Sequence, residues 1–371
     1  MGKRLRQGYT TGACAAAAAR AAVKALGSKG GPENTVRITL PQGQEIELPV
    51  TVHRGEGWAE ATVIKDAGDD PDITHGVAVK VKARFQESGL ILRAGEGVGI
   101  VTRPGLAIPV GEPAINPGPR AMIREAVKDL IPPGRGVELV FSIPGGEELA
   151  RRTLNPHLGI EGGLSILGTT GIVEPMSEEA LRESLLPQID VARAAGYDTL
   201  LLTPGRMGRR HAVEGYGLPA GAVILTSNFI GYILEACAER GVRRVLLWGH
   251  AGKLVKLAGG IFYTHSRIAD ARREIVAARA AAWGASPEIV RAILTATTVE
   301  SIFTILEQAF TGERYFAFWD HLADLASRRA RELVHGTLEV GTAFLDLQGR
   351  IMGQDGQARA ILGEWRNGGK G

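Results

Sequence analysis

Residues 8–26 read GYTTGACAAAAARAAVKAL, and alanine dominates this stretch. Alanine is the strongest helix former, so the stretch predicts a helix from Thr11 to Leu26. Alanine is too weakly apolar for the run to act as a signal peptide, and Arg20 interrupts it. Small side chains let a neighbouring element pack closely, and we interpret Cys14 in the first turn as part of that packing face rather than as a reactive thiolate.

The composition favours a soluble protein of two domains. The chain has 371 residues, of which 44% are hydrophobic and 22% are charged. A net charge of +3 without any Lys/Arg block argues against a nucleic-acid partner. Only Cys14 and Cys237 are cysteines, which predicts a reduced, cytoplasmic setting without a disulfide framework. No apolar stretch approaches the roughly 20 residues of a membrane-spanning helix.

The first part of the chain predicts an α+β domain. Its strands are indicated by alternation of apolar and polar residues between glycine-rich turns. They are expected at residues 35–40, 45–52, 59–64, 76–85 and 136–143. A second helix is expected from Pro119 to Leu130, because proline suits the first turn of a helix. Several strands with few helices are typical of an α+β domain.

After residue 152 the chain changes to near-continuous apolar strands that alternate with helices. A buried strand is expected within 164–177, and further strands are expected at 198–203, 222–227 and 243–249. This order predicts a three-layer, mostly parallel α/β sheet. Helices are expected from about Ile268 to His335, followed by a hairpin at 341–353. We therefore divide the chain into domains at 1–152 and 153–371.

The stretch IKDAGDDPDITHG, residues 64–76, gathers four carboxylates and one imidazole. A calcium loop needs acids at alternate positions and a bidentate Glu at the end, and the stretch has neither. Zinc prefers several His or Cys ligands, and only His75 is available. Asp-Asp-Pro-Asp is also ordinary turn chemistry. A metal site, a plain turn and an active-site loop all remain open for this stretch.

Several glycine-rich loops predict ligand binding through backbone amides. Thr10 or Thr11 can cap the first helix, where Gly12 would let an anion approach. LSILGTTGIVEP (164–175) and VLLWGHAGKLVKLA (245–258) place glycines after a buried strand. Neither loop has the Rossmann fingerprint or a Walker A spacing, so these loops do not identify the ligand.

A third loop, TPGRMGRR (203–210), offers Arg206, Arg209 and Arg210 as partners for carboxylates. A solvated basic loop explains the same residues equally well.

Taken together, seven segments resemble the cobalt-precorrin-5B (C-1)-methyltransferase family of the anaerobic cobalamin pathway. The segments are LRQGYTTGACAAAAARAA (5–22), VIKDAGDDPDITHG (63–76), GEGVGIVTRPGL (95–106), VGEPAINPGPRAMI (110–123), LGIEGGLSILGTTGIVEPMS (158–177), SNFIG (227–231) and GHAGKLVKLA (249–258). The resemblance covers nearly the whole chain, with departures at Gly118 and His157.

The resemblance implies an N-terminal α+β domain and a Rossmann-like three-layer α/β/α domain. It implies transfer of the methyl group of S-adenosylmethionine, the co-substrate, to C-1 of a cobalt-containing tetrapyrrole. The cobalt would arrive within the substrate, and we expect no metal site in the protein. We expect domain 1–152 to bind the macrocycle and domain 153–371 to bind the methyl donor. The oligomeric state is left open, with a homodimer among the options.

The motifs and the resemblance together give three sets of candidate residues. The candidate catalytic residues, which could accept hydrogen bonds from the ring or take up a proton, are Asp66, Asp72 and His75. The candidate substrate-binding residues are Thr10, Thr11, Arg103, Arg120 and Arg206. The candidate donor-binding residues are Gly168, Thr169, Thr170, Gly171, Asn228, Gly249, His250, Gly252 and Lys253.

Two other functions compete with this hypothesis. A nucleotide-dependent oxidoreductase or phosphotransferase would bind NAD(P) or ATP, and the missing fingerprints count against it. A non-catalytic tetrapyrrole carrier would bind the macrocycle without affinity for a methyl donor.

Overall fold

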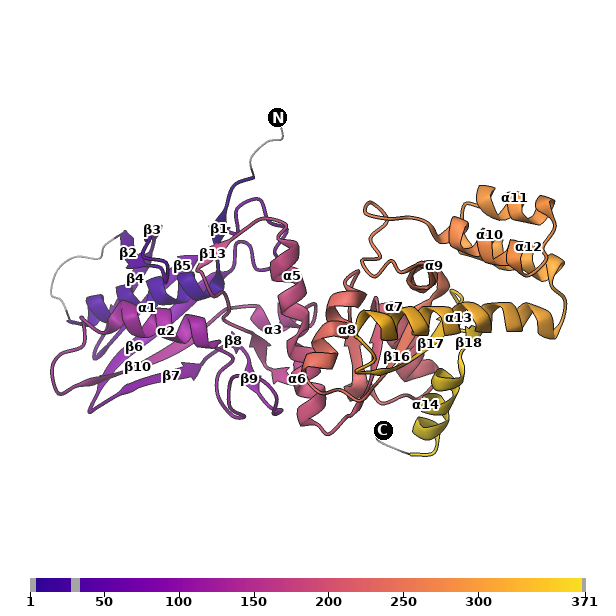
Figure 1. Ribbon diagram of the computed structural model, residues 1–371. Coiled ribbons are helices and arrows are strands. Elements are labelled where there is room, and N and C mark those ends of the chain that lie inside the picture. The colour runs from indigo at the N-terminus through magenta and orange to yellow at the C-terminus, as the bar shows by residue number, and fades with distance from the viewer. Residues whose placement is uncertain (1–4, 28–33, 369–371) are drawn as a thin grey trace. The chain divides into compact units, whose positions relative to one another are not determined.

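The computed structural model describes residues 5–27 and 34–368 of a mixed α/β protein (Figure 1). Its contacts divide the chain into two compact units, Met1–Glu178 and Glu179–Gly371. This division lies later than the expected break near residue 152. The reason is that residues 160–173 pair with strands of the first unit instead of opening a new sheet.

Six very short strands make these late pairings. They are β1 (Gly8–Tyr9) with β13 (Ile172–Val173), β9 (Ile100–Val101) with β11 (Ile160–Glu161), and β8 (Gly97–Val98) with β12 (Gly163–Leu164). The expected buried strand within 164–177 is therefore wrong as part of a parallel sheet in the second domain. Its apolar residues Leu164 and Ile166 are buried, as predicted, but in the core of unit 1. The apolar character of a segment predicts that the segment is buried, but it does not predict which of the two cores the segment enters.

Unit 1 is built on a five-stranded sheet with the strand order β4-β5-β6-β10-β7. The strands are β4 (Thr51–Gly55), β5 (Trp58–Ile64), β6 (Ala78–Gln86), β7 (Leu90–Ala94) and β10 (Gly136–Ser142). All neighbours are antiparallel except β10 and β7, which are parallel. The strands predicted at 59–64, 76–85 and 136–143 are confirmed as β5, β6 and β10. The strand predicted at 45–52 is divided between two strands, and β7 was not predicted.

Helices α1 (Thr11–Gly27) and α2 (Pro117–Val127) lie side by side on one face of this sheet (Figure 1). Both helices were predicted, and α2 begins slightly earlier than expected because Pro117 already occupies its first turn. The Arg20 guanidinium of α1 donates to the Ala126 carbonyl at 2.6 Å and to Asp129 at 2.8 Å, which ties α1 to the end of α2. Two shorter helices, α3 (Gly146–Ala150) and α4 (Asn155–Leu158), follow the sheet.

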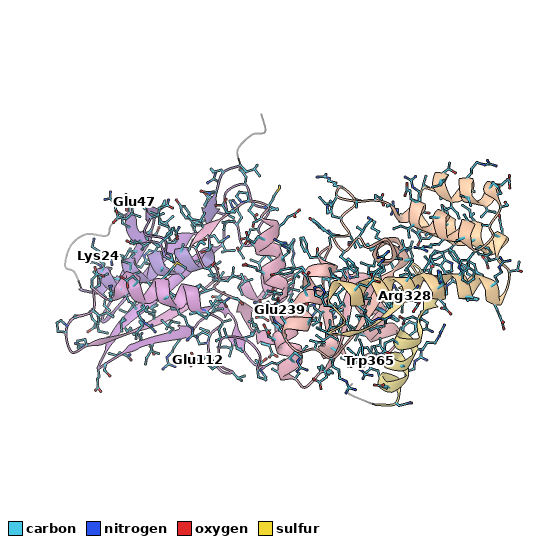
Figure 2. The ribbon with its side chains drawn as sticks, in the orientation of Figure 1. Lys24, Glu47, Glu112, Glu239, Arg328 and Trp365 are labelled. Atoms are coloured by element: carbon cyan, nitrogen blue, oxygen red, sulfur yellow. The ribbon has the colours of Figure 1, made fainter. Side chains whose placement is uncertain are left out.

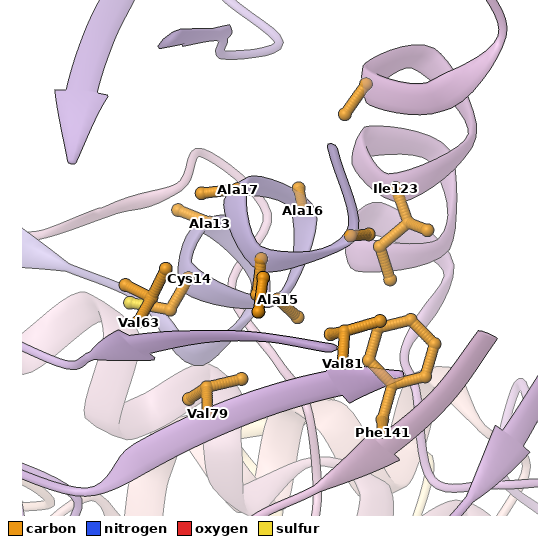
Figure 3. Close-up of a cluster of buried hydrophobic side chains, with 14 of the residues drawn as sticks. Ala13, Cys14, Ala15, Ala16, Ala17, Val63, Val79, Val81, Ile123 and Phe141 are labelled. Carbon is orange, nitrogen blue, oxygen red and sulfur yellow. The ribbon is translucent and has the colours of Figure 1, made fainter. Parts of the chain in front are cut away.

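The alanine-rich helix α1 is buried on nearly every side. Ala13 through Ala19 are fully inaccessible, and they pack against Val63, Val81 and Phe141 of the sheet and Ile123 of α2 (Figure 3). The hairpin of β2 (Thr35–Thr39) and β3 (Glu45–Pro49) also contacts α1. Only side chains as small as alanine allow a sheet, a helix and a hairpin to approach one helix at once.

The hairpin shows the alternation of a half-buried β ribbon. Ile46 and Leu48 are buried in the core around α1, whereas Glu47 lies on the outer side (Figure 2). There Glu47 accepts hydrogen bonds from the Thr35 hydroxyl at 2.6 Å and the Arg37 side chain at 3.0 Å. Burial on one face therefore fixes the register of the hairpin.

Unit 2 contains a second five-stranded sheet with the order β15-β14-β16-β17-β18. The strands are β14 (Thr199–Thr203), β15 (Val223–Leu225), β16 (Arg244–His250), β17 (Glu339–Leu345) and β18 (Ile351–Gln354). The first four strands in space are parallel, and β18 pairs antiparallel with β17. The predicted strands at 198–203, 222–227 and 243–249 and the hairpin at 341–353 are confirmed.

Helices pack on both faces of this sheet. Trp248 of β16 lies in a buried cluster with Ile361 and Leu362 of α14, whereas Phe344 of β17 contacts Trp319 of α13. The longer helices are α5 (Glu178–Leu185), α6 (Pro187–Ala194), α8 (Ile230–Glu239), α10 (Arg272–Ala282), α11 (Pro287–Thr295), α12 (Val299–Ala309), α13 (Glu313–Leu333) and α14 (Gly356–Arg366).

Short helical turns lie in the connections between the strands of unit 2. They are α7 (Arg206–Arg210), a π-helical turn (His211–Gly215), a 3-10 turn (Ala220–Ala222), α9 (Ala251–Leu254) and a second 3-10 turn (Val255–Gly259). Among the described residues, no helix is both long enough and apolar enough to cross a bilayer.

The packing of α1 predicts that larger side chains will not be tolerated there. Ala18→Leu should lower the free energy of unfolding by about 1–3 kcal/mol, because the added methyl groups have no free volume to enter. Urea denaturation measures this difference. Ala360→Leu on the exposed side of α14 is the matched control and should change stability by less than about 0.5 kcal/mol. Equal effects of the two substitutions would contradict close packing around α1.

Candidate functional site

Three segments that are far apart in the sequence meet in unit 1. They are the N-terminal segment (residues 6–12), the acidic loop (66–75) and the Gly-Thr-Thr-Gly loop (167–176), and together we call them the three-segment cluster. The Tyr9 amide donates to the Asp66 carbonyl at 2.7 Å, and the Gly12 amide donates to the Leu167 carbonyl at 2.9 Å. The entry into α1 is therefore held by both loops.

The hydroxyls of Thr10 and Thr11 serve this junction. Thr10 Oγ1 accepts a hydrogen bond from the Ala13 amide at 3.1 Å, as a helix-capping hydroxyl does. Thr11 Oγ1 accepts from the Leu167 amide at 2.9 Å and lies 3.2 Å from the Leu167 carbonyl. Both threonines are buried. Their hydroxyls hold the loop against the helix, whereas Thr169 and Thr170 at the tip of the loop are exposed.

Glycines let the Gly-Thr-Thr-Gly loop approach the helix. Gly168 has φ +115°, and a Cβ built on it would lie 2.3 Å from Cβ of Thr10. Gly171 has φ +84°, and its Cβ would lie 2.5 Å from Leu40. Both positions therefore require glycine for conformation and for space. The expected location of residues 168–171 at the edge of the parallel sheet is wrong, since they belong to unit 1.

The acidic loop uses its carboxylates mainly to bind the protein itself. Asp66 accepts two hydrogen bonds from the Arg6 guanidinium, at 2.5 and 2.9 Å, and one from the Gly68 amide at 2.9 Å. Asp69 accepts from the Arg6 amide, and Asp70 accepts from the Met176 amide. Within the described residues, no group of three His, Cys, Asp or Glu side chains gathers as metal ligands would.

These contacts decide the charge of Asp66. The hydrogen bonds from Arg6 and Gly68 lower the pKa of Asp66 to about 2. The carboxylate is therefore ionised at any physiological pH and is a weak base. It can accept hydrogen bonds from a ligand, but it is poorly suited to take up a proton.

Asp72 pairs with a buried lysine. The Lys65 ammonium is 1% exposed and donates to Asp72 at 2.6 Å, while Thr74 donates to Asp72 through its amide and its hydroxyl. Burial acts to raise the pKa of Asp72, but the hydrogen bonds from Lys65 and Thr74 outweigh burial and lower its pKa. The pair of Lys65 and Asp72 thus fixes the base of the acidic loop. The sequence alone did not indicate this role for Lys65.

His75 is the most accessible of the three candidate catalytic residues. Its Nδ1 accepts a hydrogen bond from the Ala67 amide at 3.1 Å, and the side chain is 54% exposed. Because Nδ1 is the acceptor, the neutral imidazole carries its proton on Nε2. His75 therefore presents an N–H donor toward solvent.

Cys14 is a packing residue, as predicted. It is inaccessible among Val63 and neighbouring alanines (Figure 3), and burial raises the pKa of its thiol to about 12. A thiolate is therefore absent at neutral pH.

The candidate arginines lie on separate elements of the chain. Arg120 donates to the carbonyls of Ile115 at 2.7 Å and Pro113 at 3.1 Å, so its guanidinium holds the loop before α2. Arg103 is exposed, and its aliphatic part covers Gly159. Arg206 is an exposed residue of unit 2, at the start of α7.

In unit 2, five candidate residues meet where the parallel strands end. β16 ends at His250, whose Nδ1 accepts from the Gly252 amide at 3.1 Å and caps α9. The Lys253 ammonium donates to Oδ1 of Asn228, which follows β15, at 2.8 Å. Gly249 and Gly252 complete the set. The carboxyl edge of a parallel sheet is the usual ligand site of such folds.

Sequence inspection missed two residues of this edge. Glu300 at the start of α12 lies 2.6 Å from His250 Nε2, and it orients the ring from a distant part of the chain. Lys256 is buried and donates to the carbonyls of Thr264 at 3.1 Å and Ala269 at 2.8 Å. Lys256 could have been found from the sequence, because it lies one helical turn after Lys253. No sequence pattern near Glu300 indicated its role.

Comparisons with known proteins agree on one family. The chain matches the family described as CbiD over residues 1–175 and the CbiD C-terminal domain over residues 263–356. It is 67% identical to the cobalt-precorrin-5B C(1)-methyltransferase of Moorella thermoacetica, over 98% of this chain and 99% of the relative. It is 43% identical to the protein of the same name from Methanocaldococcus jannaschii, over 95% of this chain and 96% of the relative.

A solved structure is also similar. It is the crystal structure of the cobalamin biosynthesis protein CbiD from Archaeoglobus fulgidus, which is 28% identical to this chain. The alignment covers 73% of this chain and 84% of that one, with a TM-score of 0.37.

The close approach of Gly168 to Thr10 predicts a large effect of one methyl group. Gly168→Ala should destabilise the protein by about 3 kcal/mol or more, because the new Cβ must displace Thr10 and also adopt a strained φ. Gly162→Ala is the control, since it shares a positive φ but has open space around it, and it should cost about 1–2 kcal/mol. Thermal unfolding of both variants measures the difference, and equal losses would show that Thr10 yields freely.

The Arg6–Asp66 pair predicts a pH-dependent effect. The pKa of Asp66 is lowered on folding, so its contribution to stability is present above the unfolded value of about 4 and is lost as pH falls through about 2. Asp66→Asn should therefore cost less than about 1 kcal/mol at neutral pH, because the pair is half-exposed. The cost should vanish near pH 2 in melts recorded against pH. A constant difference would mean that Asp66 acts through its shape and not its charge.

Proposed function

The chain belongs to the CbiD family, and we propose that it is a cobalt-precorrin-5B C(1)-methyltransferase of anaerobic cobalamin biosynthesis. The observation that carries the proposal is 67% identity over nearly the full length of both chains to a protein of that name. Membership of this family argues against the competing hypothesis that the chain is a nucleotide-dependent oxidoreductase or phosphotransferase.

We infer that the methyl donor is S-adenosylmethionine and that unit 2, as a Rossmann-like domain, binds it. The donor supplies an electrophilic methyl group on a sulfonium. Asn228, His250, Gly252 and Lys253 stand at the carboxyl edge of parallel strands, the position where ligands bind in doubly wound sheets. Gly168–Gly171 belong to unit 1. The candidate donor-binding residues of unit 2 are therefore Asn228, Gly249, His250, Gly252 and Lys253.

We infer that the three-segment cluster of unit 1 binds the tetrapyrrole. A corrinoid precursor is a flat apolar ring with a rim of carboxylates. The cluster carries exposed apolar side chains, with Leu167 51% and Met176 67% exposed, and it also contains the N–H donor of His75. Ile64, the last residue of β5 before the acidic loop, is 60% exposed. Apolar surface for the ring face and polar groups for the rim are the two requirements of such a site.

The residues of the acidic loop are then positioning groups. Methyl transfer from a sulfonium requires alignment of the donor with the nucleophilic carbon and exclusion of water. Asp66 and Asp72 are held as carboxylates by Arg6 and Lys65, so they can accept hydrogen bonds from the ring or its amides. His75 donates through Nε2. Together they would fix the orientation in which C-1 faces the methyl group.

The direct test is a methyl-transfer assay. Incubating the protein with cobalt-precorrin-5B and S-adenosylmethionine labelled in its methyl group should give a product heavier by one methyl group, with the label at C-1 by NMR. His75→Ala should lower kcat/KM about tenfold, the value of one hydrogen bond to a charged group. His53→Ala, an exposed histidine of β4, is the matched control and should leave kcat/KM unchanged.

Each alternative has its own outcome in this assay. Binding of the macrocycle without methylation or donor affinity would support a carrier instead of an enzyme. Methylation with equal rates for wild type and His75→Ala would keep the enzyme but remove His75 from the binding site.

A further inference from the structure

Lys253 is a cation that forms no ion pair with the residues that the structure describes. It is partly buried at the carboxyl edge of unit 2, and its ammonium donates to the amide oxygen of Asn228 at 2.8 Å. In the described part of the chain, no carboxylate lies within 4.0 Å of it. Burial, together with the nearby charge of Lys256, lowers the pKa of Lys253. Holding an ammonium in this position costs free energy unless an anion compensates it.

The carboxylates nearby already have partners. Lys256 lies 3.5 Å from Asp270, and Arg272 lies 3.3 Å from the same carboxylate. Glu300 is hydrogen-bonded to His250. The net charge of the side chains around Lys253 is therefore positive.

A second polar group at this edge is the buried hydroxyl of Thr264. The Thr264 residue is 2% exposed, and its hydroxyl has no hydrogen-bond partner among residues 5–27 and 34–368. The Thr264 amide donates to the Asn228 carbonyl at 2.9 Å, so this residue is joined directly to the partner of Lys253. Buried hydroxyls are normally hydrogen-bonded. Within the described residues, an ammonium without a carboxylate partner and a buried hydroxyl without a hydrogen-bond partner thus belong to two residues that both bind Asn228. Together they indicate a site for an oxygen-rich anion.

We propose that Lys253, oriented by Asn228, binds a carboxylate of the ligand at this edge. This inference rests on the proposed function, whose two substrates both carry carboxylates. One source is the amino-acid carboxylate of S-adenosylmethionine, and the other is the carboxylate rim of the tetrapyrrole. In either case Lys253 forms the charge-assisted hydrogen bond that the folded chain does not supply.

The test compares a donor with and without its carboxylate. Calorimetry should show that wild-type protein binds S-adenosylmethionine about 10–100 times more tightly than decarboxylated S-adenosylmethionine, the range for a charge-assisted hydrogen bond. Lys253→Met should abolish this preference by weakening the carboxylated ligand alone. Lys253→Arg should restore part of it. Arg366→Met, at an exposed position of α14, should leave both affinities unchanged.

A parallel titration with cobalt-precorrin-5B separates the two sources. A 10–100-fold loss for the tetrapyrrole, with unchanged donor affinity, would assign the carboxylate to the macrocycle. Unchanged affinity of Lys253→Met for both ligands would overturn the inference. Failure of the wild-type protein to bind S-adenosylmethionine or the tetrapyrrole would instead count against the proposed function. Lys253→Gln, which keeps a polar side chain, serves if the methionine variant does not fold.

Discussion

The structure of unit 1 depends on the close packing that alanine allows around α1. A sheet, a second helix and a hairpin all contact this one helix, and its residues from Ala13 to Ala19 are inaccessible. Larger side chains would push these elements apart, because protein interiors have almost no free volume. The same packing brings the start of α1 to the acidic loop and to the Gly-Thr-Thr-Gly loop, which are far from it in sequence. Packing of small residues thus assembles the candidate macrocycle site.

The two candidate sites use their charges differently. In unit 1 the acids of the loop are matched within the protein, since Arg6 and Lys65 bind Asp66 and Asp72. Such internal pairing makes a rigid polar surface on which the Nε2–H of His75 is available to donate a hydrogen bond. In unit 2 the charge is not balanced around Lys253. A matched surface suits orientation of a large ring, and an unmatched cation suits capture of an anionic group.

Local patterns predicted much of the fold. Alanine content predicted α1, alternation predicted β5, β6 and β10, and apolar runs predicted β14, β15 and β16. The division between units was not predictable in this way. Residues 164–177 have the apolar character of a buried strand, but they pair with β8 and β1 and enter the core of unit 1. Hydrophobicity measures the tendency to be buried, and it carries no information on the partner.

The sequence by itself determined the alanine-rich helix, the alternating strands β5, β6 and β10, the apolar strands β14, β15 and β16, and which loops carry glycines and acids, because these properties depend on neighbours along the chain. It also determined the family, through seven segments in order. Only the tertiary structure decided that Gly168 lies against Thr10, that Lys65 neutralises Asp72 and that Glu300 orients His250. Each of these contacts joins elements whose approach is fixed by packing and strand register, and a charge or a glycine acquires its role only when its partner is in place.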